Sequence, residues 1–192
     1  MITDNDIALQ RLRDGNRRFV GGLSGGQFTA QRSTESAAGQ NPWAVVVGCS
    51  DSRVPVEAVF DVGVGDLFVV RTAGHVLAAA SIASVRFAVE KLGARTIVVL
   101  GHEDCGAVSA ALVGDAPEWL APITDHIFIA DVDAASAPAD ADNALLAAAV
   151  DRHVLNTVNQ LRELIAGFGL GTETVVSGAA YKLASGEVHW LD

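Results

Sequence analysis

Basic residues are scarce in this sequence. Its 192 residues include 13 lysines and arginines against 23 aspartates and glutamates, which gives a formal net charge of -10. General nucleic-acid binders release counterions through clustered lysines and arginines, so this composition argues against a nucleic-acid partner. The acidity is concentrated, because ten carboxylates and no lysine or arginine occur between Arg95 and Arg152.

Long uncharged runs are also absent. The longest stretch without a charged residue, residues 36–50, has 15 residues and includes Pro42. A helix that crosses a bilayer needs about 20 apolar residues. The first 19 residues contain charges throughout and show no apolar signal-peptide core. The sequence therefore predicts a cytoplasmic protein with no membrane partner.

Cysteine is rare, with only Cys49 and Cys105 in the chain. In a reducing compartment a well-placed cysteine pair is more often metal-binding or catalytic than disulfide-bonded. Charged residues make up 19% of the chain and apolar residues 50%. This composition excludes a disordered chain and indicates one substantial core that needs no disulfide.

Apolar runs alternate with helical segments along the chain. Helical periodicity is expected at residues 3–19, at 81–92 and from 142 or 143 to 165. Continuous apolar runs typical of buried parallel strands occur at 43–48, 67–70, 96–101 and 174–180, and an edge strand is expected at 187–191.

This alternation predicts an α/β fold. We expect a single structural domain with a mostly parallel β-sheet, formed by about four parallel strands and a C-terminal edge strand and flanked by helices. Within it, residues 1–35 are expected to form an N-terminal helical arm, and residues 36–192 the α/β domain that carries the chemistry.

Sulfur-bearing and polar side chains follow two of the expected strands. Cys49 comes directly after the first strand, and His102 and Cys105 follow the third. Ligands of parallel sheets lie beyond the carboxyl ends of the strands, so these side chains should meet at one edge. Two thiolates and an imidazole suit Zn²⁺ and leave a fourth tetrahedral position for water. Asp51 is a candidate for that position in a closed site, with Arg53 as the bidentate partner that holds it back.

Each part of this pattern also has a simpler interpretation. Cysteines are commonly buried for packing alone, and the pair of Asp51 and Arg53 would in most proteins be only a local salt bridge. A redox disulfide also remains open, as does a purely structural zinc site with Asp51 as permanent fourth ligand.

Two motifs, C-S-D-S-R at 49–53 and G-H-x-x-C-G at 101–106, each follow an expected strand. In order and spacing they resemble β-class carbonic anhydrases, and the likeness covers most of the chain. The resemblance implies one zinc ion per chain, bound by Cys49, His102 and Cys105, with Asp51 and Arg53 as the catalytic dyad. It implies reversible hydration of CO₂ to bicarbonate and a proton by zinc-bound hydroxide, in a homodimer or homotetramer.

The resemblance also assigns a substrate pocket. Gln40 matches an amide that reaches across the dimer to the substrate in plant-type members. Phe68 and Phe87 match pocket aromatics, although their burial preference alone would make them core residues. His75 is a candidate proton relay, since an unperturbed histidine titrates near neutral pH. Glu103 and Asp104 depart from the family pattern, and their charges would oppose hydroxide formation if they faced the metal.

Two further functions remain open. Some similar proteins use the same fold and zinc site to hydrolyse carbonyl sulfide or carbon disulfide, and the ligands do not distinguish these linear substrates from CO₂. A catalytically silent zinc-binding module, with Asp51 locked on the metal, is the third hypothesis. The presence of Arg53 argues against it, because Arg53 offers the carboxylate a partner in an open site.

Overall fold

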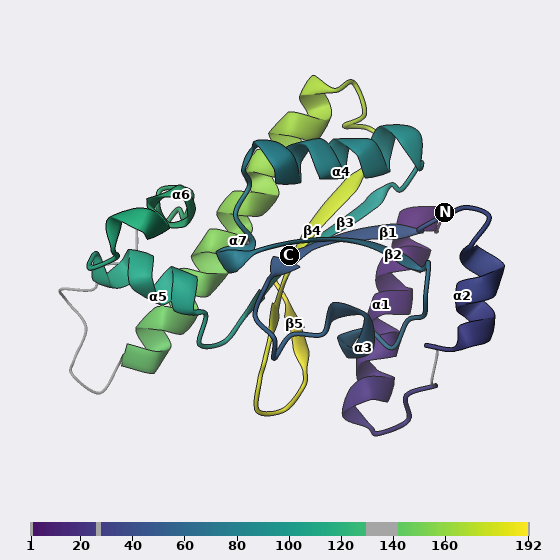
Figure 1. Ribbon diagram of the computed structural model, residues 1–192, viewed down its shortest axis with the longest axis horizontal. Helices are drawn as coiled ribbons and strands as arrows, with labels where there is room; N and C mark the ends of the chain where they lie inside the picture. The colour runs from purple at the N-terminus through teal and green to yellow at the C-terminus, as the bar shows by residue number, and fades with distance from the viewer. Residues whose placement is uncertain (1, 26–27, 130–141, 192) are drawn as a thin grey trace.

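The computed structural model of the protein describes residues 2–25, 28–129 and 142–191. A five-stranded sheet lies at its centre, in the order β2-β1-β3-β4-β5 (Figure 1). The strands are β1 (Ala44–Cys49), β2 (Leu67–Thr72), β3 (Thr96–His102), β4 (Val175–Tyr181) and β5 (Val188–Trp190). The first four pair in parallel, and β5 pairs antiparallel with β4. The α/β class and the edge strand are confirmed, with strand ends one or two residues from the predicted positions.

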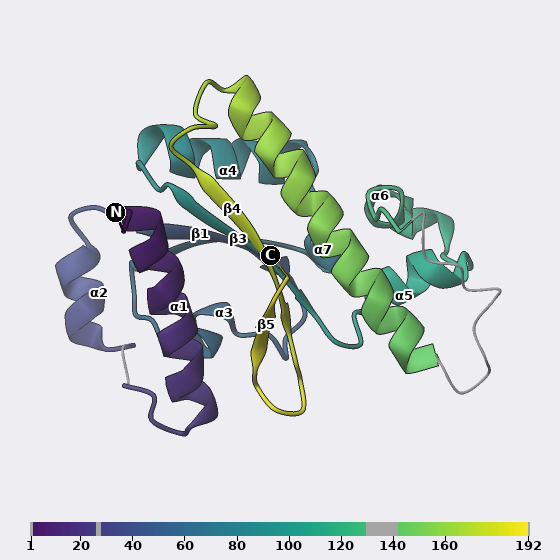
Figure 2. The ribbon, with the colours of Figure 1, turned by 180° about the vertical axis from the view of Figure 1, so that it is seen from behind.

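Helices cover both faces of the sheet (Figures 1 and 2). They are α1 (Asp4–Val20), α2 (Ala30–Ser36), α3 (Val56–Val59), α4 (Ala79–Lys91), α5 (Gly106–Val113), α6 (Ala121–Thr124) and α7 (Asp142–Gly167). Short 3-10 helices lie at Ala73–His75 and Glu118–Leu120. Within these ranges, no helix is both long and apolar enough to cross a membrane.

The residues of β1 alternate between two cores. Val45 and Val47 join the cluster that contains α4 and α7, whereas Val46 joins the cluster that contains α1 and α3. All three valines are fully buried. A strand that is buried on both faces reads as a continuous apolar run, which explains why this segment showed no alternation in the sequence.

The N-terminal helix α1 packs directly on the sheet. Thr3 and Asp6 form a capping box at the start of the helix, and Leu12 is fully buried against the second core. Asn16, one helical turn after Leu12, is also buried, and its side-chain amide donates hydrogen bonds to the carbonyls of Val59 and Gly186. The division into an arm (1–35) and a domain (36–192) stays a prediction.

Candidate metal centre

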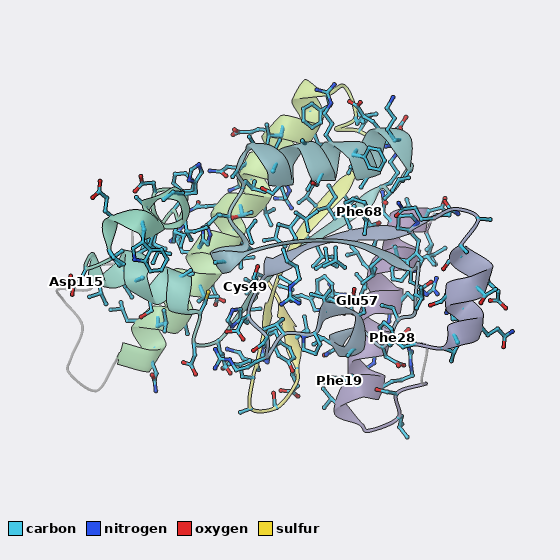
Figure 3. All side chains as sticks on the ribbon, viewed as in Figure 1. Phe19, Phe28, Cys49, Glu57, Phe68 and Asp115 are labelled. Atoms are coloured by element: carbon cyan, nitrogen blue, oxygen red, sulfur yellow. The ribbon has the colours of Figure 1, made fainter. Side chains whose placement is uncertain are left out.

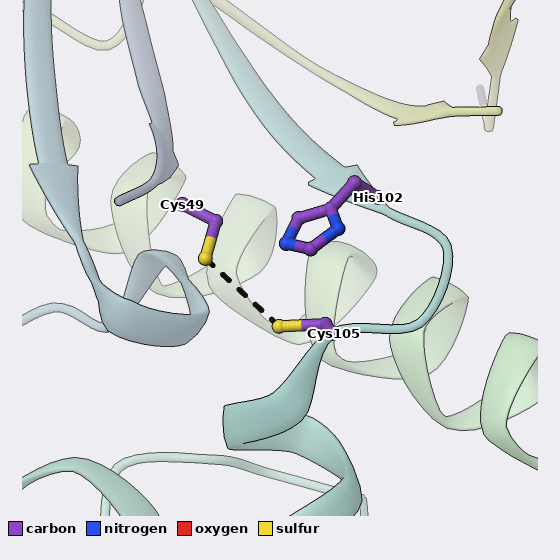
Figure 4. A group of neighbouring side chains, drawn as sticks. All are labelled: Cys49, His102 and Cys105. Carbon is purple, nitrogen blue, oxygen red and sulfur yellow. Dashed lines mark hydrogen bonds between the residues drawn. The ribbon is translucent and has the colours of Figure 1, made fainter. Parts of the chain in front are cut away.

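Three side chains that can bind a metal ion meet at the carboxyl edge of the sheet (Figure 4). Cys49 ends β1, His102 ends β3, and Cys105 immediately precedes α5. Their ligand atoms all lie within 4.8 Å of one another, and the two Sγ atoms are 4.0 Å apart. All three residues are buried. The expected meeting of these residues at one sheet edge is therefore confirmed.

The ring of His102 is oriented for a metal ion. Its Nδ1 lies 2.7 Å from the carbonyl oxygen of Glu103, which can only accept, so Nδ1 carries the proton. The other ring nitrogen, Nε2, is buried and has no hydrogen-bond partner in the described part of the chain. A metal ion would supply the partner that this atom lacks. With two cysteines beside it, the donor set fits zinc and leaves a fourth position open.

Hydrogen-bond donors favour a thiolate at Cys49. The thiol of Cys105 lies within hydrogen-bonding distance and lowers the pKa of Cys49 to about 4. The backbone N–H of Gly74 also donates to the Cys49 sulfur, at 3.3 Å. The same cysteine contact raises the pKa of Cys105. The protein therefore stabilises at Cys49 the ionised form that binds metals.

Asp51 and Arg53 form a bidentate ion pair beside the three ligands. Arg53 donates from Nε to Oδ1 at 3.0 Å and from Nη2 to Oδ2 at 2.8 Å. This pairing lowers the pKa of Asp51 to about 2. The Oδ2 atom of Asp51 lies 3.9 Å from Nε2 of His102. The carboxylate thus lies beside the three possible metal ligands while Arg53 holds it, the pairing expected of an open site.

Arg71 of β2 fixes the loop that carries this pair. Its Nε donates to the carbonyl of Cys49 at 2.7 Å, and its Nη2 donates to the carbonyl of Asp51 at 2.6 Å. The sequence alone does not indicate that Arg71 contacts this loop. Its register opposite Gly48, one residue before Cys49, would have indicated the contact once the pairing of β1 and β2 was known.

The carboxylate of Glu103 is compensated within the protein. Lys182 lies 3.2 Å from Oε1, and the backbone N–H of Leu183 donates to Oε2 at 3.0 Å. Both partners belong to the turn between β4 and β5. The charge expected to oppose ionisation at the metal therefore has its own cation and donor.

Phe68, one of the pocket residues expected from the resemblance, lies away from Cys49 of the same chain (Figure 3). In the register of β1 and β2, Cys49 lies opposite Thr72 and Phe68 lies opposite Val45. Phe68 is therefore roughly 13 Å back along the strand. It contacts Phe87 of α4, with ring centroids 6.2 Å apart.

Gln40 and Phe87 are both accessible from outside the chain. Gln40 is exposed and lies before the first residue of β1, whereas Cys49 is the last residue of that strand. Phe87 is 47% exposed. A single chain therefore does not bring Gln40, Phe68 or Phe87 to its own metal position.

His75 is not placed to relay protons to solvent. The ring is fully buried, and neither of its nitrogens has a hydrogen-bond partner among the residues described. Burial lowers its pKa well below the ordinary value. The ring stacks on His153 of α7, with centroids 4.5 Å apart. The structure thus argues against the relay hypothesis and makes this histidine part of the buried packing between Gly101 and His153.

The two buried histidines predict that acid destabilises the fold. Burial lowers the pKa of His153 to about 4, and it also lowers the pKa of His75 well below its ordinary value. As pH falls through about 6.5 the unfolded chain binds protons that the folded chain does not, so the free energy of unfolding decreases between about pH 6.5 and pH 4. For His153 alone the loss at pH 5 is about 2 kcal/mol.

Urea unfolding near pH 7 and near pH 5 measures this loss. A His153→Gln variant removes one of the two titrating groups, so its stability should change less between the two pH values. Equal changes in the variant and the wild type would contradict the assignment to His153.

Comparison with known sequences identifies relatives along the chain. A family profile described as carbonic anhydrase matches residues 44–188. "Carbonic anhydrase 2" of Mycobacterium tuberculosis is 50% identical over 113 residues, which cover 57% of this chain and 54% of that protein. That match therefore spans about half the length of the relative. The carbonic anhydrase of Mycolicibacterium smegmatis is 40% identical over 200 residues, covering 98% of this chain and 94% of that protein.

Solved structures agree with the sequence comparison. The β-carbonic anhydrase CcaA has a TM-score of 0.74 and 25% identity, with 96% of this chain and 95% of that chain covered. The β-carbonic anhydrase CafA of Aspergillus fumigatus has a TM-score of 0.70 and 26% identity, with 97% and 89% covered. Together with the cluster of two cysteines and a histidine at the sheet edge, these matches show that the chain belongs to the β-class carbonic anhydrase family.

Proposed function

We propose that this protein is a zinc-dependent carbonic anhydrase that reversibly hydrates CO₂ to bicarbonate and a proton. The observation that carries the proposal is the buried Nε2 of His102, which lacks a hydrogen-bond partner among the described residues and lies beside the sulfurs of Cys49 and Cys105. Zinc bound there would supply Lewis-acid activation of water. The activity of the whole protein is inferred from this chemistry and from the family. The M. tuberculosis match alone does not carry it, because that match spans only about half of the relative.

The three proposed ligands also determine the pH range of activity. Cys49 and Cys105 would bind as thiolates, which donate more negative charge than imidazoles do. Zinc centres with neutral imidazole ligands have a bound water of pKa about 7. We therefore expect hydration by this protein to increase into the mildly alkaline range.

Asp51 and Arg53 are proposed as the catalytic dyad. Held by two hydrogen bonds from Arg53, the Asp51 carboxylate can accept a hydrogen bond from the reacting water and orient it toward CO₂. Its low pKa keeps it ionised at neutral pH. If Asp51 left Arg53 and occupied the fourth ligand position, it would exclude that water and close the site.

A second copy of the chain is proposed to complete the substrate pocket. Gln40, Phe68 and Phe87 lie away from the metal position of their own chain, and Phe87 is half exposed. We propose that these residues bind substrate at the site of the partner in a homodimer or homotetramer. The mass in solution, measured together with the zinc content per chain, tests this assembly.

The proposed location is the cytoplasm. Both cysteines are free and buried rather than disulfide-bonded, which suits a reducing compartment. Localisation of the tagged protein in its own cells tests this part of the proposal.

Comparative turnover tests the proposed substrate. Zinc-loaded protein should hydrate CO₂ much faster than it hydrolyses carbonyl sulfide or carbon disulfide, and the reverse order would assign it to those hydrolases. X-ray absorption between pH 6 and pH 9 tests the silent alternative. Four protein ligands over that whole range would support a silent zinc-binding module instead.

A further inference from the structure

A tight turn at Ala73–His75, directly after β2, contacts Cys49, one of the proposed metal ligands. Gly74 and His75 have φ values of 62° and 46°, so two consecutive residues are left-handed, which costs free energy in a non-glycine residue. The N–H of Gly74 donates to the sulfur of Cys49 at 3.3 Å. A Cβ atom at position 74 would lie 3.1 Å from Ala107 and 3.2 Å from Ile127. The turn is thus pressed against the start of α5.

His153 of α7 holds the same turn from the other side. Its Nε2 lies 2.9 Å from the carbonyl oxygen of Gly74, and its Nδ1 lies 3.3 Å from the backbone nitrogen of Phe128. A carbonyl only accepts and a backbone N–H only donates, so the ring is neutral with its proton on Nε2. His75 stacks on this ring. Both nitrogens of His153 therefore have hydrogen-bond partners within the protein, which matters because the residue is only 1% exposed.

We propose that His153 is a positioning residue of the metal centre, which acts through Gly74 on the thiolate of Cys49. This inference rests on the proposed zinc site and deepens it. Glycine has the widest conformational freedom of all residues, so its own sterics do not fix the direction of its N–H. The N–H of Gly74 belongs to the peptide that follows Ala73, and its C=O belongs to the peptide that precedes His75. The hydrogen bond from His153 holds the second peptide, which limits the rotations of Gly74 that would turn its N–H away from the sulfur.

The hydrogen bond from Gly74 to the sulfur of Cys49 would change how strongly that sulfur binds a metal ion. A donor on a thiolate lowers the electron density of the sulfur and restricts its direction, and such outer contacts tune metal centres. Packing alone would favour an apolar residue at position 153, because α7 buries Val150 and Val154 on the same side. Both nitrogens of His153 are hydrogen-bonded, which offsets the cost of burying this polar ring.

Two amide variants separate the two hydrogen bonds of His153. The amide of His153→Gln reaches the position of Nε2 and can still donate to Gly74. The shorter amide of His153→Asn reaches the position of Nδ1, so it keeps the contact with Phe128 and loses Gly74. Val158→Ala, which shortens a buried residue of the same helix, controls for lost packing.

The readouts are the rate of zinc loss to a chelator and the thiolate-to-cobalt charge-transfer absorption of the cobalt-loaded protein. His153→Asn should lose zinc about tenfold faster than wild type. The charge-transfer band of cobalt-loaded His153→Asn should move to longer wavelength. A thiolate that accepts no hydrogen bond transfers an electron to the cobalt at lower energy. His153→Gln and Val158→Ala should match the wild type in both. Equal zinc loss and equal spectra in His153→Asn and Val158→Ala would overturn the inference.

A measurement on the wild type covers the case in which His153→Asn does not fold. In cadmium-loaded protein, the hydrogen bond to Cys49 should transmit a scalar coupling between the metal and the amide proton of Gly74; its absence overturns the inference. Failure of the proposed function is distinguishable, since a wild type that binds neither zinc nor cobalt would overturn both proposals. If the wild type binds zinc and cobalt, and the His153 variants show the same zinc loss and cobalt spectra as the wild type, only the role of His153 is overturned.

Discussion

Replacing Cys49 with alanine is expected to abolish zinc binding and CO₂ hydration together. The variant leaves His102 and Cys105 as the proposed ligands, fewer than the three protein ligands of catalytic zinc sites. It also removes the sulfur to which Gly74 donates. We expect no retained zinc after dialysis, and hydration at the uncatalysed rate in stopped-flow measurements.

The effect of Cys49→Ala on the metal must be separated from an effect on folding. Cys49 is buried at the end of a central strand, so the far-ultraviolet circular dichroism and the urea midpoint of the variant are compared with those of zinc-free wild type. Matching values with lost activity support the proposed ligand role. Equal activity in the variant and the zinc-loaded wild type would refute it.

Asp51→Asn is expected to lower kcat about 100-fold while the zinc content stays at one per chain. Asparagine keeps the shape of the side chain but replaces one acceptor oxygen with an NH₂ group. That group would face a guanidinium N–H, so the bidentate pair with Arg53 is lost. The hydrogen-bond acceptor that orients the reacting water is then misplaced.

Arg53→Lys is the matched variant for this experiment. Lysine keeps the positive charge but offers a point charge in place of the planar fork, so an intermediate loss of kcat is expected. Metal analysis of both variants distinguishes orientation from ligation. If Asp51→Asn lost zinc as completely as Cys49→Ala, Asp51 would be a ligand and not part of an open dyad.

The fold and the metal cluster could be predicted from the sequence because their signals are local. The apolar runs ending at Gly48 and Gly101 identified strands that are buried on both faces. The rule that parallel sheets bind ligands at their carboxyl edge then placed Cys49 beside His102 and Cys105. The donor set of two cysteines and a histidine indicated zinc, and the resemblance added the reaction, which strand patterns alone do not specify.

Contacts between distant segments could not be predicted in this way. His153 reaches Gly74 across 79 residues, and the helical periodicity of α7 shows only that position 153 borders the buried stripe. The burial of His75 depends on its left-handed turn and on α7, which is why the relay hypothesis failed. The roles of Gln40, Phe68 and Phe87 depend on a second chain and stay predictions.

Zinc add-back followed by stopped-flow CO₂ hydration tests the central claim most directly. The wild type is stripped of metal with a chelator and then titrated with zinc, and the hydration rate is measured at each step. The proposed function predicts no catalysis without zinc and a linear increase that saturates at one zinc per chain. Hydration that is independent of zinc, or a fully loaded protein without activity, would contradict it.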